Sequence, residues 1–278
     1  MTWLQTTCDG CKVLAGPMWL GRAHLFAAVA TLALSSAYRA GAQIVPYFPT
    51  PPALVDRMLE LAQVKENDFL IDLGCGDGRI PIAAARRYGT PGLGVDIQPQ
   101  VLADAVENAR KAGVAGKVAF KQQDLFDTDL GKATVLTLYL SLKLDIALRP
   151  RILQTMKPGT RVISHNFVMG DWLPDRTEQI EGHMLYLWIV PATVQGSWQV
   201  SYNGPERAKS FPLELDQQFQ ELIGNAVIDG KAVPMHDARV SGEYVSFAVD
   251  MGNGKSLRFE GRSVNGHLEG DGWTATRR

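Results

Sequence analysis

The chain contains a glycine-rich turn placed where a strand changes into a helix. Gly74, Gly76 and Gly78 follow the apolar run at residues 69–71 and precede a helical segment that starts at Arg79. Glycine permits unusual backbone angles there and lets a ligand lie against the main chain. Arg79 stands where the dinucleotide-binding pattern has its third glycine. The turn therefore predicts a site for a small ligand other than a dinucleotide.

Three acidic residues sharpen this prediction. Asp72 precedes the turn, Asp96 ends a second apolar strand, and Asp124 ends a third strand beside Leu125. A carboxylate after the second strand can accept hydrogen bonds from both hydroxyls of a ribose. An acid with an apolar neighbour suits adenine, because the acid accepts from the exocyclic amine while the apolar side chain packs on the ring. The alternative is an ordinary strand–helix turn with surface acids.

Helices and strands that alternate from residue 52 to residue 191 predict an α/β fold with a mostly parallel sheet and helices on both faces. The predicted helices cover residues 52–62, 79–88, 99–112 and 144–156, and the predicted strands cover residues 69–72, 92–95, 118–122, 133–139, 160–164 and 182–191. Thr50 is expected to cap the first helix, with Pro51 at its first position. Ligands bind such sheets at the carboxyl ends of the strands, where Asp72, Asp96, Asp124 and Tyr139 lie.

From Val194 onward the sequence changes to short alternating segments separated by glycine-containing turns. This pattern predicts an antiparallel β domain of about seven strands, a barrel or a sandwich. The predicted domains are therefore residues 43–193 and 194–278. Trp198 and Trp273 are expected to fill one core, and the alternative is that they line a ligand or peptide groove.

Residues 1–42 have the composition of a leader. An apolar, uncharged run at 25–37 is followed by the small-x-small site at 40–42, which is typical of a secretory signal peptide read from Met18. The run is shorter than the roughly 20 residues that span a bilayer as a helix. An uncleaved membrane anchor or a surface helix is the alternative. The sequence thus predicts an exported or membrane-associated protein, with translation starting at Met1 or Met18.

Composition narrows the function classes further. A formal net charge of −1 over 278 residues argues against a protein that binds nucleic acid through bulk electrostatics. Cys8, Cys11 and Cys75 give no disulfide framework, and a single C-x-x-C without nearby histidines is a weak zinc signal. No metal site is therefore expected, and Cys75 is expected to be a small filler in the turn.

The glycine turn together with Asp96 and Asp124 resembles the motifs of class I S-adenosylmethionine (SAM) methyltransferases, which have a Rossmann-like doubly wound sheet. Residues 46–175 are also similar to the seven-strand protein-lysine methyltransferases related to the enzymes that modify the ATP synthase c-subunit and the adenine nucleotide translocase. The stretches that carry this resemblance are residues 46–51, 72–80, 133–140, 148–150, 157–162 and 164–172.

The resemblance implies SAM as cosubstrate and a protein lysine as acceptor, including lysines of membrane-associated proteins. The implied cofactor site consists of Thr50, Asp72, Gly74, Gly76, Asp77, Gly78, Asp96, Ile97, Asp124, Leu125 and Tyr139. Tyr139 and Leu140 are the implied catalytic positions, where a neutral amine is placed in line with the methyl group. His165 is either a proton acceptor or a structural residue.

The chain also departs from the family pattern. Ser141 and Leu142 stand where the family usually has Leu-Pro, and Asn166 and Val168 replace residues that are commonly acidic. These changes lie near the positions implied to receive the acceptor amine, and none of them is an implied cofactor-binding residue. Two other hypotheses are an exported, non-catalytic ligand-binding module and a small-molecule methyltransferase, since fold alone does not fix the substrate.

Overall fold

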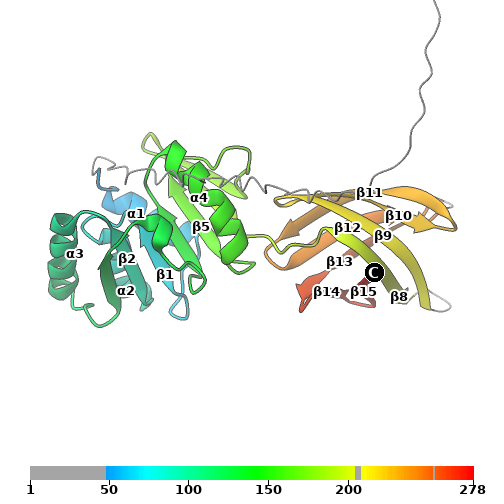
Figure 1. Cartoon of the computed structure of the whole chain (residues 1–278), viewed down its shortest axis with the longest axis horizontal. Helices are drawn as coiled ribbons and strands as arrows, with labels where there is room; N and C mark the ends of the chain where they lie inside the picture. The colour runs from blue at the N-terminus through cyan, green and yellow to red at the C-terminus, as the bar shows by residue number, and fades with distance from the viewer. Residues whose placement is uncertain (1–47, 204–207, 253) are drawn as a thin grey trace, which may run out of the picture. The chain divides into compact units, whose positions relative to one another are not determined.

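The computed structural model describes residues 48–203, 208–252 and 254–278 (Figure 1). The predicted leader, with Cys8 and Cys11, lies outside the described residues. Within the described ranges, no helix combines the length and apolarity needed to cross a membrane.

A seven-stranded sheet forms the first part of the described chain, in the order β3-β2-β1-β4-β5-β7-β6. The strands are β1 (Leu70–Leu73), β2 (Gly92–Asp96), β3 (Val118–Gln122), β4 (Val135–Leu138), β5 (Arg161–His165), β6 (Arg176–Ile180) and β7 (His183–Ile189). Strands β1 to β5 are parallel, and β7 runs antiparallel to both of its neighbours. The strand order reverses between β1 and β4, so the predicted doubly wound α/β fold is confirmed.

Helices cover both faces of this sheet (Figure 1). They are α1 (Pro52–Leu61), α2 (Arg79–Tyr88), α3 (Pro99–Lys111) and α4 (Leu142–Thr155), with a short 3₁₀ helix at Leu125–Asp127. Along β4, Val135 belongs to the cluster formed with α1 and α2, whereas Leu136 packs with α4. A strand that is covered on both faces has apolar residues at successive positions, and such a run can be recognised in the sequence.

Two local predictions were wrong. Thr50 does not cap α1, because the N-cap is Pro51 and no side-chain hydrogen bond caps the helix. Pro52 has no N–H to offer a capping hydroxyl, and Thr50 Oγ1 instead hydrogen-bonds His165 Nδ1 at 3.2 Å. The prediction also missed β6, whose sequence RTEQI is polar because this edge strand is largely exposed.

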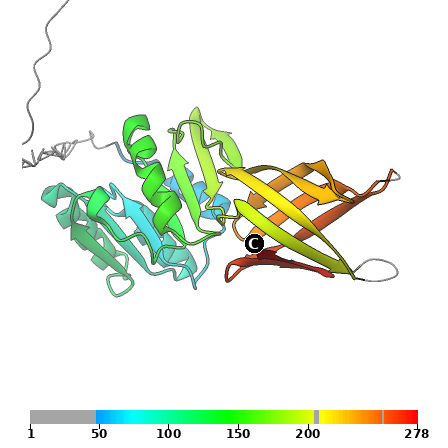
Figure 2. The same cartoon turned by 45° about the vertical axis from the view of Figure 1, so that its right-hand side comes forward.

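The second part of the chain is a closed antiparallel barrel of eight strands (Figure 2). The strands are β8 (Gly196–Asn203), β9 (Ala208–Gln218), β10 (Glu221–Ile228), β11 (Lys231–Ser241), β12 (Tyr244–Asp250), β13 (Ser256–Val264), β14 (His267–Gly270) and β15 (Trp273–Arg277). The prediction of about seven strands was one short because a turn divides residues 267–276 into β14 and β15.

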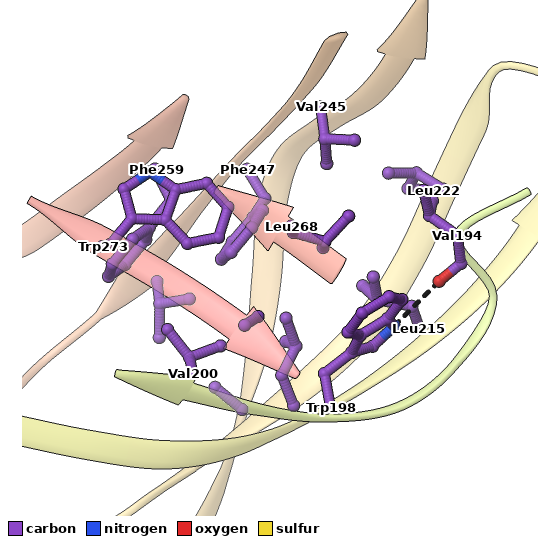
Figure 3. Packing of buried hydrophobic residues seen from close by; sticks show 14 of the residues in the cluster. Val194, Trp198, Val200, Leu215, Leu222, Val245, Phe247, Phe259, Leu268 and Trp273 are labelled. Carbon is purple, nitrogen blue, oxygen red and sulfur yellow. Dashed lines mark hydrogen bonds between the residues drawn. The ribbon is translucent and has the colours of Figure 1, made fainter. Parts of the chain in front are cut away.

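Aromatic and aliphatic side chains fill the interior of the barrel (Figure 3). Trp198 and Trp273 are buried in one cluster, which confirms their predicted core role. Their indole N–H groups donate to the carbonyls of Val194 and Glu260, both at 2.9 Å. Phe247 lies 5.0 Å from Phe259 and 5.6 Å from Trp273, measured between ring centroids. The barrel interior is therefore a packed core.

Candidate active site

The turn between β1 and α2 leaves no room for side chains at two of its glycines. Gly74, Gly76 and Gly78 adopt left-handed angles, with φ of +78°, +53° and +76°. A Cβ atom on Gly74 would lie 2.6 Å from Leu140 Cδ2, and one on Gly78 would lie 2.6 Å from the Phe120 ring. Backbone conformation and close contact both require glycine. The turn consequently presents main-chain groups, rather than side chains, at the carboxyl end of β1.

The carboxylate of Asp96, at the end of β2, ties the glycine turn to the start of α3. Its Oδ2 accepts from the N–H of Gly76 at 3.0 Å, and its Oδ1 accepts from the N–H of Gln98 at 2.9 Å. Each carboxylate oxygen has a second lone pair, so the group can still accept from two ligand hydroxyls. The two N–H bonds hold it in one orientation for that purpose.

Asp72 lies deeper than the sequence suggested. Its side chain on β1 is 2% exposed, and its Oδ1 accepts from Thr137 Oγ1 on β4 at 2.6 Å. Burial raises the pKa of Asp72 to about 7, and the charges of Asp96 and Asp77 add to this, while the Thr137 bond opposes it. A cationic group bound beside Asp72 would favour its ionised form.

The third acid lies at the end of β3. Asp124 Oδ1 accepts from the N–H of Phe126 at 2.9 Å and so caps the 3₁₀ helix. Leu125 and, after β2, Ile97 are half-buried. The N–H of Gln123 donates to the Asp96 carbonyl at 3.0 Å, which joins the two strand ends. An acid and two apolar side chains thus follow neighbouring strands, as a site for a purine ring would require.

Arg79 joins the glycine turn to the segment before α1. Its Nε and Nη2 donate to the Asp77 carboxylate at 2.9 Å and 2.7 Å, and its Nη1 donates to the Thr50 carbonyl at 2.8 Å. The segment that carries Thr50 therefore lies beside the turn. The sequence had marked Arg79 only as a departure from the dinucleotide pattern.

The two implied catalytic positions differ in exposure. Leu140 is buried, and its side chain lies over Gly74. Tyr139 is half-buried, with its ring centroid 3.9 Å from that of His165 and 6.2 Å from that of Phe167. Tyr139 and Phe167 therefore form an aromatic surface at the ends of β4 and β5.

A buried histidine lies under Tyr139. His165 Nδ1 hydrogen-bonds the Thr50 hydroxyl, and its Nε2 lies 3.0 Å from Nδ1 of His183 at the start of β7. Burial, with the neighbouring His183, lowers the pKa of His165 to about 4, so the ring is neutral near pH 7. Sequence reasoning missed His183 and Phe167, because only the antiparallel return of β7 places His183 beside the end of β5.

The acidic and aromatic side chains lie along one edge of the sheet. Asp72 lies near the end of β1, Asp96 ends β2 and Asp124 follows β3, and the aromatic surface lies at the ends of β4 and β5. Burial raises the pKa of the Cys75 thiol, in keeping with its predicted filler role. In the described part of the chain, no cluster of three His, Cys, Asp or Glu side chains is arranged to hold a metal ion.

Known proteins with similar sequences are methyltransferases. Residues 72–176 match the model of the ANTKMT methyltransferase domain. A protein-lysine N-methyltransferase of Saccharolobus islandicus is 39% identical over 151 residues, which is 52% of this chain and 94% of that protein. The mouse lysine N-methyltransferase of the ATP synthase c-subunit is 29% identical, over 48% of this chain and 53% of its own length.

A solved structure gives a similar result. The RNA methyltransferase from Salinibacter ruber, determined in complex with S-adenosyl-L-homocysteine, is 51% identical with a TM-score of 0.52. That match covers 53% of this chain and 96% of the other. Each of these relatives matches about half of the chain.

One buried acid near the site has no evident part in ligand binding. Asp145, in the first turn of α4, is fully buried, and its Oδ2 accepts from Ser164 Oγ at 2.9 Å. Its Oδ1 has no hydrogen-bond partner among the described residues. Burial raises the pKa of Asp145 to about 7.

The Asp145→Asn variant should therefore show a weaker pH dependence of stability than the unaltered protein. Between about pH 4 and about pH 7 the folded state keeps a proton on Asp145 that the unfolded chain has lost, so stability falls as pH rises. Asparagine does not ionise, so the variant lacks this loss of stability. Its melting temperature minus that of the parent should therefore be larger at about pH 8 than at about pH 5. Asp104→Asn, at an exposed position on α3, is the control. The prediction is wrong if the melting temperatures of the Asp145 variant and the parent differ by the same amount at about pH 5 and at about pH 8.

Proposed function

Because this chain belongs to the family of SAM-dependent protein-lysine N-methyltransferases, we propose that it methylates the side-chain amine of a lysine in a protein substrate. The observation that carries the proposal is the match to the Saccharolobus enzyme, which extends over 94% of that enzyme at 39% identity. The match of residues 72–176 to the ANTKMT domain supports the same acceptor class.

We propose that the three acids contact different parts of SAM. Asp96, with both oxygens already oriented by N–H groups, accepts from the two ribose hydroxyls. Asp124 accepts from the adenine amine, with Ile97 and Leu125 on the faces of the ring. Asp72 faces the ammonium of the methionine portion, and the positive charge there ionises it. Thr50, Asp77 and Tyr139, with the glycine turn, complete the cofactor site.

Methyl transfer requires an uncharged amine, because the nitrogen lone pair attacks the methyl carbon. The carbon–sulfur bond breaks, its electron pair stays on sulfur, and the new nitrogen–carbon bond forms in line with it. We assign Tyr139 and Leu140 to the approach of the amine, since the Tyr139 ring is half-buried and Leu140 covers the turn. Desolvation beside these side chains lowers the pKa of the incoming lysine and so supplies the neutral form.

RNA is the second candidate acceptor, because the Salinibacter relative is described as an RNA methyltransferase and is 51% identical. The net charge of −1 favours protein, since RNA binding depends on neutralising phosphate charge with Lys and Arg. The sequence-based alternatives of a non-catalytic module and of a small-molecule enzyme are not favoured by the named relatives.

We also propose that the leader keeps the enzyme at the membrane, where a membrane-associated protein is the acceptor. Support comes from the apolar run at 25–37 and from the need for SAM, which is made in the cytosol. Fractionation followed by N-terminal sequencing should find the chain in the membrane fraction with the leader intact. A soluble, exported chain that starts at Gln43 would contradict this proposal.

The Asp96→Asn variant should bind SAM about 100-fold more weakly in calorimetry. Two hydrogen bonds to an ionised group are weakened, each worth about 1.5–3 kcal/mol, and about 1.4 kcal/mol corresponds to a tenfold change. The asparagine side chain keeps an oxygen for one of the two N–H donors, so the fold should persist. Asp104→Asn should leave the affinity unchanged. Equal affinity of the Asp96 variant and the parent would refute the assignment of Asp96.

Methyl-labelled SAM added with the enzyme to a cell lysate should place label in protein. The label should survive ribonuclease, disappear on proteolysis, and run with methylated lysine after acid hydrolysis. The Asp96→Asn variant is the matched negative control, because it is altered only in the cofactor site. Label that enters RNA or a lipid-soluble product instead would show that the acceptor class is wrong.

A further inference from the structure

The turn between β9 and β10, residues 219–220, contacts the segment after β5. Gln220 is 3% exposed, and both ends of its amide are used on that segment. Its Oε1 accepts from Trp172 Nε1 at 2.9 Å, and its Nε2 donates to the Leu173 carbonyl at 2.6 Å. The oxygen and the nitrogen of this buried amide both hydrogen-bond to the same loop, and together the two bonds fix the position of that loop.

The residue before Gln220 adds a second, independent contact. Phe219 adopts a left-handed φ of +55°, which is uncommon for a residue with a large side chain. In that conformation its ring stacks on Trp172 with centroids 6.0 Å apart, and the guanidinium of Arg149 lies 5.2 Å from the ring centroid. Arg149, on α4, also donates to the Met169 carbonyl at 2.8 Å.

Residues 166–175, the loop held in this way, also form part of the candidate acceptor site. Phe167 stacks against Tyr139 at its amino-terminal end, and Asn166 Oδ1 accepts from the N–H of Met184. Trp172, at its centre, is fully buried, and its carbonyl accepts from Trp188 Nε1 at 2.8 Å. The loop therefore runs from the aromatic surface at Tyr139 to the barrel turn.

We propose that the β9–β10 turn is a brace that positions the acceptor side of the active site, with Gln220 as its key positioning residue. The barrel would then take part in methyl transfer through this loop, since every residue assigned above to the SAM or acceptor site precedes the barrel in the chain. The brace acts on the acceptor loop, whereas the three acids assigned to SAM lie at the ends of β1, β2 and β3. The proposal concerns the acceptor site of the function proposed above, and so rests on it.

The test uses the full chain with Gln220→Ala and, separately, Trp172→Phe, which keeps an aromatic ring but removes the N–H that Gln220 accepts. Both variants should speed hydrogen exchange of residues 166–175. Both should lower kcat/KM for the acceptor by about tenfold, as expected when a buried hydrogen bond is lost. The calorimetric Kd for SAM should stay within about twofold. Gln199→Ala, on β8 of the barrel, is the matched control.

The double variant separates a brace from general loosening. If the two residues act through one hydrogen bond, Gln220→Ala combined with Trp172→Phe should cost little more than either single change. Unchanged exchange of the loop, unchanged acceptor kinetics, or a SAM Kd that weakens as much as acceptor kcat/KM would overturn the proposal. If the parent enzyme methylates no acceptor, the proposed function fails, and loop exchange in the variants still decides whether the brace exists.

Discussion

The close packing of the glycine turn is the constraint on which the candidate site depends. The strand order reverses between β1 and β4, so the residues after β4 lie over the turn that follows β1. Leu140 occupies the space that a Cβ of Gly74 would need, and Phe120 does the same at Gly78. These two positions therefore exclude any side chain, and Asp96 fixes the turn through the N–H of Gly76. Leu140, which we assign to the approach of the amine, therefore packs directly on the turn that we assign to SAM.

The sequence was informative where burial is uniform or where spacing is local. Strands β1 and β4 are buried at every position and β5 at all but its first, and the bounds of α2 and β3 were predicted to the residue. It was uninformative where burial is low or where a partner is distant. The polar strand β6 gave no hydrophobic signal. Thr50 was assigned to a helix cap, although its hydrogen-bond partner, His165, is 115 residues away.

The candidate site divides in the same way. The glycines, Asp96 and Asp124 could be identified from sequence because each lies at or soon after the end of a predicted strand. The burial of Asp72 against Thr137 could not, since it depends on the pairing of β1 with β4. Contacts made by Gln220 were beyond sequence reasoning for a further reason. They join two separately predicted domains, and the sequence pattern of each domain can be explained without any contact to the other. The barrel has its own core, so the proposed role of the barrel at the active site rests on contacts of the β9–β10 turn, which lies outside that core.

We propose that the carboxyl ends of β1, β2 and β3 hold SAM. A crystal structure of the protein with sinefungin, a SAM analogue that carries an amine in place of the sulfonium methyl, tests it most directly. Both ribose hydroxyls should donate to Asp96, the adenine should lie beside Asp124, and the amino-acid portion should reach the glycine turn next to Asp72. A ligand bound elsewhere, or one that leaves the Asp96 carboxylate without a ribose contact, would show that this assignment of the site is wrong.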